Sequence, residues 1–400
     1  MRVKRESASK LAGLVLTLAA MAAAGCVQPA PEQPSQNAGG GGRAQTGKVR
    51  IGFSMDTLKE ERWQRDHDLV KARAEAVGAE IEIQVANGSD ADQSKQCENM
   101  LTKGVDVLIV APHNGVAAAA IVEMAKKKNV PVISYDRLIM NSDVDLYVSH
   151  QVTKIGQMQA QYALDHAPRG NYVIIYGSQT DNNAMLLKDG QMSVLKPAID
   201  SGTIKVISEL HAREWLASEA RRITDDALTK AGNDIQAIVA SNDGTAGGAI
   251  SALPSSLVGK VLVTGQDAEL PAVQRIAQGE QTMTIYKPIT PLAHSAVDSA
   301  MKLARGEKVE TTTTTNNQKI DVPSILHEPL VADKNNLMQT VVKDGYHKYE
   351  DVYKNVPEAQ RPPRPASAAT ASRPAFYALP ALLTFFVAGA VFVARRRVTP

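Results

Sequence analysis

The sequence predicts an α/β fold of two lobes, each built on a parallel sheet that helices cover on both faces. Short apolar runs rich in β-branched residues alternate with stretches of helical periodicity from about residue 48 to about residue 354. This alternation is typical of parallel sheets enclosed between helix layers. A helical stretch at 154–167 ends the first series and a second series follows, which predicts two similar lobes in tandem.

The first series supplies one lobe. Its strands are expected at 49–55, 80–85, 105–110, 130–135 and 146–149, and its helices at 60–77, 92–102 and 115–127. The second series supplies the other lobe. Its strands are expected at 172–176, 204–208, 235–240, 261–264 and 282–286, and its helices at 184–199, 218–230, 245–253 and 268–278.

The end of the folded region returns to both lobes. A helix is expected at 288–305, and the five threonines at 311–315 predict an exposed strand. The runs 321–326 and 328–331 indicate crossings between the lobes. We therefore expect the N-terminal lobe at 48–152 and 289–322, and the C-terminal lobe at 153–288 and 323–348.

Polar side chains follow five of the expected strands. They include Arg62 with Trp63, Asp136 with Arg137, Asp181 with Asn183, and the single residues Asn242 and Asp267. Small ligands bind at the carboxyl ends of strands in open α/β sheets. Carboxylates, amides and guanidinium groups make paired hydrogen bonds to hydroxyls, so the pattern predicts a ligand rich in hydroxyl groups. Asn242 or Asp243 can instead cap the following helix, and we expect Asp243 to do so.

Composition narrows the classes of function. Four hundred residues are enough for two domains, each with its own core. A net charge of +2 gives no sign of a nucleic-acid surface. Cys97 has no evident disulfide partner, so we expect it to pack as a small apolar residue.

The N-terminus has the pattern of an export signal. Basic residues precede an apolar run from 11 to 24, which predicts a signal peptide at 1–25. Ala23-Ala24-Gly25-Cys26 resembles the lipobox of bacterial lipoproteins, which implies lipidation of Cys26. The alternative is ordinary cleavage near Ala24, with Cys26 left as a free thiol. Residues 26–47 are rich in Pro, Gln, Ala and Gly, as in a flexible tether.

The C-terminus carries a second candidate anchor. Residues 355–374 have the composition of a linker, and 375–394 contain no charge. Twenty apolar residues can span a bilayer, and Arg395 to Arg397 would then remain cytoplasmic. The alternative is a sorting tail that is later removed. Either way the folded region is placed outside the membrane.

Runs of sequence throughout the folded region match a known family. They are Glu61-Arg62-Trp63-Gln64, Ala86-Asn87-Gly88, Glu98-Asn99-Met100, 104–108, Tyr135-Asp136-Arg137, Gly170-Asn171-Tyr172, 181–184, Gly190-Gln191-Met192, 194–197, 239–250, 265–268, 281–284, 286–290 and 343–348. On these runs the region from about 48 to 348 resembles the D-xylose-binding proteins of bacterial ABC transporters. These are members of the ribose/galactose type of periplasmic sugar-binding proteins. The family lacks both of the tails described above.

The resemblance implies a type I periplasmic-binding-protein fold with its ligand between the lobes. It implies ten ligand-binding residues: Arg62, Trp63, Asp136, Arg137, Asp181, Asn183, Trp215, Asn242, Asp267 and Lys287. It also implies a monomeric receptor, not an enzyme, that needs no cofactor or metal. Such a receptor captures a monosaccharide, here D-xylose, by hinge closure and delivers it to an ABC permease and its ATPase. The expected location is the outer face of the cell membrane or the periplasm, with the protein anchored to the membrane.

Some alternatives remain open at this stage. Trp63 can belong to a helix core, Trp215 to lobe packing, and Lys287 to an exposed hinge surface. His113 and His211 lack metal-ligand spacing, and we expect surface roles for both. A tethered protein of this fold can also be a sugar sensor that signals to a membrane receptor.

Two further classes of function are disfavoured. A glycosidase needs a general acid beside its second carboxylate, and Arg137 and Lys287 would keep Asp136 and Asp267 ionised. A transcriptional repressor of this fold needs an N-terminal helix-turn-helix where this chain has its export signal.

Overall fold

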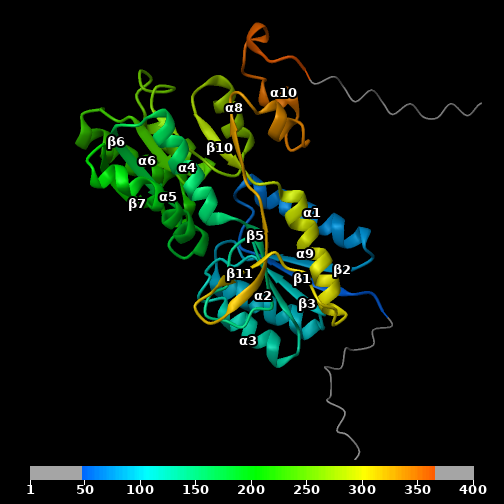
Figure 1. The fold of residues 1–400 in the computed structure, drawn as a ribbon. Helices are drawn as coiled ribbons and strands as arrows, with labels where there is room; N and C mark the ends of the chain where they lie inside the picture. The colour runs from blue at the N-terminus through cyan, green and yellow to red at the C-terminus, as the bar shows by residue number, and fades with distance from the viewer. Residues whose placement is uncertain (1–46, 365–400) are drawn as a thin grey trace, which may run out of the picture. The chain divides into compact units, whose positions relative to one another are not determined.

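The computed structural model describes residues 47–364. The segments expected as signal peptide and membrane span, the tether up to residue 46 and the second half of the linker lie outside them. The strands are β1 Arg50–Met55, β2 Glu80–Val85, β3 Val107–Val110, β4 Val132–Tyr135, β5 Leu146–His150, β6 Gly170–Tyr176, β7 Ile204–His211, β8 Ala237–Ala240, β9 Leu262–Val263, β10 Met283–Tyr286, β11 Thr313–Asn316, β12 Asp321–His327 and β13 Leu330–Asp333. The longer helices are α1 Glu61–Ala76, α2 Asp90–Lys103, α3 Ala119–Lys127, α4 Val152–His166, α5 Asn182–Asp200, α6 Ala217–Ala231, α7 Asp243–Ala252, α8 Leu270–Gln278 and α9 Ile289–Ala304 (Figure 1). Short helical segments are η1 Arg213–Trp215, η2 Met338–Val342, α10 Tyr349–Val352 and η3 Glu358–Gln360.

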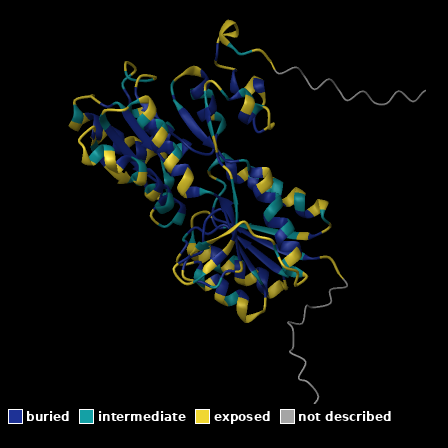
Figure 2. Ribbon diagram, viewed as in Figure 1, coloured by how far each residue is buried: buried dark blue, intermediate teal, exposed yellow. Residues whose placement is uncertain are grey.

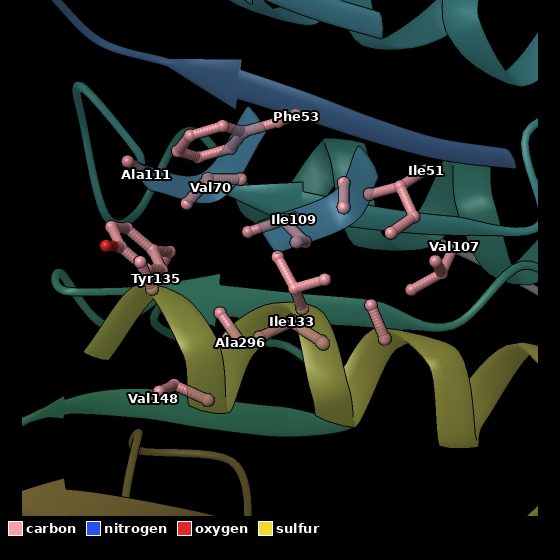
Figure 3. Close-up of a cluster of buried hydrophobic side chains, with 14 of the residues drawn as sticks. Ile51, Phe53, Val70, Val107, Ile109, Ala111, Ile133, Tyr135, Val148 and Ala296 are labelled. Atoms are coloured by element: carbon pink, nitrogen blue, oxygen red, sulfur yellow. The ribbon is translucent and has the colours of Figure 1, made fainter. Parts of the chain in front are cut away.

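The first lobe is built on a sheet in the order β11-β12-β5-β4-β3-β1-β2. All its neighbouring strands are parallel except β11, which pairs antiparallel with β12 at the edge. Because successive side chains of a strand point to opposite faces, the sheet has two cores. One face packs against α1 and α9 and the other against α2 and α3. Figure 3 shows the first of these, in which Phe53, Ile109 and Ile133 belong to the same cluster as Val70 of α1 and Ala296 of α9.

The second lobe repeats the plan with the sheet order β7-β6-β8-β9. Helices α4 and α5 cover one face, and α6 and α7 cover the other. Strand β10 lies beside the segment that follows β9, where Gln266 forms a parallel bridge with Ile285 of β10. Strand β13 pairs with β10. Buried residues run through the sheets of both lobes, and the exposed ones gather on the outer helix faces (Figure 2).

Three segments connect the lobes within residues 47–364. The chain passes from β5 to α4, from β10 to α9 and from β12 to β13. Each crossing is short, and each begins at the end of a strand. This arrangement is typical of a hinge, in which a few residues at element ends absorb a rotation.

The elements expected from the sequence are present, with shifts at their ends. Helix α3 begins at Ala119 rather than 115, because Asn114 Oδ1 accepts hydrogen bonds from the amides of Val116 and Ala117 in a turn. Strand β12, expected as a crossing, pairs with β5 as far as His327, past the division expected after residue 322. Cys97 is buried as expected, and burial raises the pKa of its thiol to about 11. Within residues 47–364, no helix has the length and apolar character that a membrane span requires.

Candidate functional site

Residues from both lobes line one cavity at the carboxyl ends of the strands. Its walls are Glu60, Arg62, Trp63, Asp136, Arg137, Asp181, Asn183, Trp215, Asn242, Gln266, Asp267 and Lys287. The ten residues singled out from the sequence are therefore brought together. They lie in the loops, or at the start of the helical segments, that follow β1 and β4 of the first lobe and β6 to β10 of the second. This is the edge at which parallel sheets bind ligands.

Each cation at the centre of the cavity contacts a carboxylate. Arg62 Nη1 donates to Asp136 Oδ2 at 2.7 Å, and Lys287 Nζ lies 3.6 Å from the same oxygen. Arg62 also donates to Asp66, which is buried behind it, at 2.8 and 3.0 Å. Lys287 Nζ lies 2.9 Å from Asp267 Oδ1. A set of buried charges that are already paired with one another suits a neutral ligand better than an ion.

These contacts fix the ionisation of Asp136. Burial alone would raise the pKa of its carboxyl group, but the positive charges of Arg62 and Lys287 outweigh burial and hold it well below its ordinary value. Asp136 is therefore an anion at neutral pH. It can accept hydrogen bonds from hydroxyls but cannot donate a proton to a leaving group.

A second ionic chain runs through Arg137. Its guanidinium donates to Asp56 Oδ2 at 2.6 Å and lies 2.8 Å from Asp181 Oδ2. Asp56 is also 2.9 Å from His113 Nδ1. Burial would raise the pKa of Asp56, but His113 and Arg137 lower it to about 2. His113 is thus buried against Asp56, and the surface role expected for it is wrong.

Direct hydrogen bonds join the lobes across the cavity. Asn183 of α5 donates from Nδ2 to both the carbonyl and the Oδ1 of Asp136, at 3.1 Å each. Trp215 Nε1 donates to Asp181 at 3.2 Å within the second lobe. The walls are therefore held in place by polar contacts that a bound ligand can share or replace.

The two tryptophans differ in their surroundings. Trp63 is 3% exposed and packs in the α1–α9 core, while the guanidinium carbons of Arg62 and Arg137 lie 4.3 and 5.2 Å from the centre of its ring. Trp63 therefore both packs in the core of the first lobe and lines the cavity. Trp215 is half-buried, and its ring lies against the backbone of Gly177, where a Cβ atom would come within 2.1 Å of it. Indole faces are well suited to the C–H surfaces of a sugar ring.

Three oxygens in the cavity walls have no hydrogen-bond donor among residues 47–364. They are Glu60 Oε2, Asn183 Oδ1 and Asp267 Oδ1, and all three are buried. Lys287 lies close to Asp267 Oδ1, yet the two lack hydrogen-bond geometry. Unpaired buried acceptors are unfavourable, so a ligand that supplies hydroxyl donors would stabilise this arrangement.

Backbone strain is concentrated at the same place. Asp136, Trp215 and Asp267 have φ angles of 60°, 56° and 95°, in the region that favours glycine. Strain of this kind persists where surrounding contacts hold it, and it is frequent at ligand sites. Here it aims three wall residues at one cavity.

The role expected for Asp243 is wrong. Asn242 is the N-cap of α7, since its Oδ1 accepts from Thr245 N at 2.9 Å. Asp243 instead accepts hydrogen bonds from Gln281, Thr284 and the amide of Glu269. Burial raises its pKa to about 7, although Arg275 opposes that shift. Asn242 thus both caps the helix and lines the cavity.

Sequence reasoning missed two wall residues, Glu60 and Gln266. Both lie next to strand ends that had been singled out, Glu60 just before Arg62 and Gln266 just before Asp267. Both would have been identified if every polar residue near each strand end had been considered.

Comparison with known proteins agrees with this geometry. The family model described as the periplasmic binding protein domain matches residues 51–308. The chain belongs to the periplasmic binding protein family. Among its relatives, the D-xylose-binding periplasmic proteins of Haemophilus influenzae and Escherichia coli are each 47% identical to it over 306 residues. The match covers 76% of this chain and 92% and 93% of those proteins.

Solved structures place the fold in the same family. A carbohydrate transporter solute-binding protein from Chloroflexus aurantiacus, in complex with D-glucose, is 33% identical and superposes with a TM-score of 0.72. The match covers 76% of this chain and 98% of that protein. The type I periplasmic-binding-protein fold expected from the sequence is therefore confirmed, with parallel sheets in both lobes.

Proposed function

We propose that this protein is an exported receptor that binds D-xylose and delivers it to an ABC permease. The observation that carries the proposal is the cavity itself, where paired charges, buried acceptors that lack a hydrogen-bond donor, and two indoles come together from both lobes. This is the chemistry that a neutral sugar requires. The relatives named as D-xylose-binding periplasmic proteins support this choice of sugar.

The ten residues named above are the proposed ligands. Asp136 and Asp267 accept from vicinal hydroxyls, and Arg62 and Lys287 donate to ring and hydroxyl oxygens. Asn183 and Asn242 can both donate and accept. Trp63 and Trp215 cover the C–H faces of the sugar. A pentose is favoured over a hexose by space, since a hydroxymethyl group at C5 would need room inside a tightly lined cavity.

Binding proceeds by hinge closure. Sugar held by one lobe adds contacts to the other, so the closed arrangement gains population in proportion to its extra affinity. The three crossings between the lobes are the hinge. The permease and its ATPase would then recognise the closed form, and no covalent step is needed.

The two terminal segments bear on where the protein is located in the cell. We infer export from the N-terminal signal and from the periplasmic relatives. Lipidation of Cys26 and a membrane span at 375–394 are proposed from the sequence alone, and both would hold the receptor at the outer face of the membrane.

Calorimetric titration of the purified protein with D-xylose, L-arabinose, D-ribose and D-glucose tests the proposal. We expect micromolar or tighter binding of D-xylose and weaker binding of the other sugars. Tight binding of another sugar instead would change the proposed specificity, while failure of all four would overturn the receptor function. Asp143→Asn is a suitable control, because Asp143 pairs with Lys126 and Lys319 on the exposed surface.

A further inference from the structure

A second group of contacts joins the lobes beside the cavity but outside it. Lys59 follows β1 in the first lobe, and its Nζ donates to the backbone carbonyl of Glu214 at 2.7 Å. Glu214 belongs to η1 in the second lobe. That carbonyl is part of the peptide bond that joins Glu214 to Trp215. The first lobe therefore holds the backbone of the tryptophan that the second lobe contributes to the cavity.

The backbone held in this way is strained. Glu214 and Trp215 have φ angles of 52° and 56°, which side chains larger than glycine rarely adopt. A conformation of this kind needs contacts that maintain it. The hydrogen bond from Lys59 is one such contact, and the bond from Trp215 Nε1 to Asp181 is another. The first of these spans the two lobes and is therefore lost when they separate.

His113 adds an ionic contact across the same gap. Its backbone amide is fixed by Gln93 at 2.9 Å, and its Nδ1 faces Asp56 in its own lobe. Its Nε2 lies 3.8 Å from Glu214 Oε2 in the other lobe. Gly115, two residues further along, donates its amide to the carbonyl of Thr180, again across the lobes at 3.1 Å. The loop after β3 thus meets the second lobe at two points.

From these contacts we propose that Lys59, His113 and Glu214 form a latch between the lobes. The latch sets Trp215 over the sugar cavity and links sugar binding to uptake of a proton by His113. The inference rests on the proposed sugar-receptor function and adds residues that position a wall of the cavity without lining it.

The direction of the proton linkage follows from which contacts depend on closure. Hydrogen bonding to Asp56 raises the pKa of His113 above its ordinary value, burial opposes this, and the carboxylates of Glu214 and Asp90 raise it further. Asp56 and Asp90 stay beside His113 when the lobes separate, but Glu214 does not. The charge of Glu214 therefore raises the pKa of His113 only in the closed form. This contact with Glu214 favours closure at low pH, and its contribution is lost as the pH rises through the closed-form pKa of His113, which lies above the ordinary value of about 6.5.

Other titratable groups also make sugar binding depend on pH, so the experiment must distinguish their effects from that of His113. Arg137 reaches His113 only through Asp56, and Lys59, Glu60 and Asp181 line the space between the lobes beside it. His150 and His327 lie at the hinge, and Asp243 and Glu269 lie behind the cavity. Glu214→Gln removes one carboxylate and leaves all of these in place. It also leaves the backbone carbonyl that accepts from Lys59.

The test is titration of the full chain with D-xylose between pH 6 and pH 8.5 for the wild type, Lys59→Met and Glu214→Gln. Lys59→Met should weaken binding about 2- to 10-fold at every pH, because it removes the hydrogen bond to Glu214 and the partly exposed ion pair with Glu60. Lys59→Arg should restore most of it. At pH 8.5, Glu214→Gln should bind D-xylose as tightly as the wild type. Toward pH 6 the wild type should gain about 2- to 5-fold in affinity and the variant should not. The gain is small because the pair of His113 and Glu214 is partly exposed. Lys196→Met and Glu75→Gln, which alter exposed pairs on the outer helices, are the matched controls.

A spectroscopic measurement isolates the positioning of Trp215. The chain has two tryptophans, so Trp63→Phe leaves Trp215 as the sole indole. In that background the change in Trp215 emission on saturation with sugar should be smaller when Lys59 is replaced by Met. The latch is overturned if the wild type binds D-xylose while Lys59→Met and Glu214→Gln behave like their controls. Absence of sugar binding by the wild type overturns the proposed function, and the latch with it.

Discussion

Arg137 and Asp181 belong to different lobes, and Arg137 Nε lies 2.8 Å from Asp181 Oδ2 with both side chains buried. Asp181 is also the N-cap of α5, where it accepts from the amide of Asn183 at 2.8 Å. The ion pair requires the two lobes to be close together. The same carboxylate therefore organises one lobe and reaches the other.

Asp181→Asn should separate these two roles. Asn is as good an N-cap as Asp, so α5 should form and the free energy of unfolding should change by less than about 1 kcal/mol. Loss of a charge-assisted contact should weaken D-xylose binding by about 10- to 150-fold, the equivalent of roughly 1.5–3 kcal/mol. Calorimetry and urea denaturation measure the two effects. Unchanged affinity would contradict a role for this carboxylate in the closed form.

The two tryptophans should respond differently to truncation. Trp63→Ala removes a buried ring from the core of the first lobe and should lower the free energy of unfolding by about 3–5 kcal/mol. Trp215→Ala removes a half-buried ring and should act mainly on sugar affinity. Urea denaturation of both variants, followed by circular dichroism, is the measurement. Equal losses of stability would show that Trp215 is a packing residue rather than a cavity wall.

The hinge should make stability depend on pH. His150 is 1% exposed, its Nδ1 has no partner within residues 47–364, and its ring centre lies 5.9 Å from that of His327. Burial, and then the charge of Lys287, hold the pKa of His150 well below its ordinary value. Burial also lowers the pKa of His327. Both rings are therefore neutral in the folded protein and take up protons on unfolding. Their contribution to stability is present above pH 6.5 and is lost as the pH falls below it.

Replacing His150 tests this directly. The free energy of unfolding of the wild type should fall between pH 6.5 and pH 5 with a slope of up to about 1.4 kcal/mol per pH unit for each histidine. His150→Gln should have a shallower slope, whatever its effect at pH 7. His166→Gln, at an exposed position on α4, is the control. Parallel slopes for the wild type and His150→Gln would exclude the hinge histidines as the cause.

Much of the fold could be predicted because its signals are local. The β-branched strands and the polar residues after them identify each βα unit, and so they identify the wall residues as well. The predictions that failed concern contacts between residues that are far apart in the sequence. Nothing near His113 in the sequence shows that it will face Asp56, which is 57 residues away. Asp243 likewise has the pattern of a cap, and only its contacts with Gln281 and Thr284 show its buried role.

The role of β12 illustrates the same limit. The sequence pattern of β12 does not show which lobe the strand joins. The pairing of Ser324 and Ile325 with β5 decides this, and that pairing depends on the whole first lobe. Strand partners are set by tertiary context more than by local preference.

The contact between α4 and α5 depends on two glycines. A Cβ atom on Gly156 would lie 2.2 Å from the carbonyl oxygen of Leu187, and one on Gly190 would lie 2.1 Å from that of Thr153. Both obstacles are backbone atoms, so the helices themselves would have to move apart. Helix propensity alone would favour alanine by about 1 kcal/mol at either site. The steric effect should exceed this gain.

Gly156→Ala and Gly190→Ala should therefore each lower the free energy of unfolding by about 1–3 kcal/mol or more, as overpacking does. Gly47→Ala, where a Cβ atom would meet nothing within 4 Å, should be nearly neutral. Urea denaturation compares the three variants. Because α4 begins directly after a hinge crossing, a shift of this helix should also weaken sugar binding by moving the second lobe relative to Asp136. A variant that is as stable as the wild type would mean that the two helices can separate at little cost.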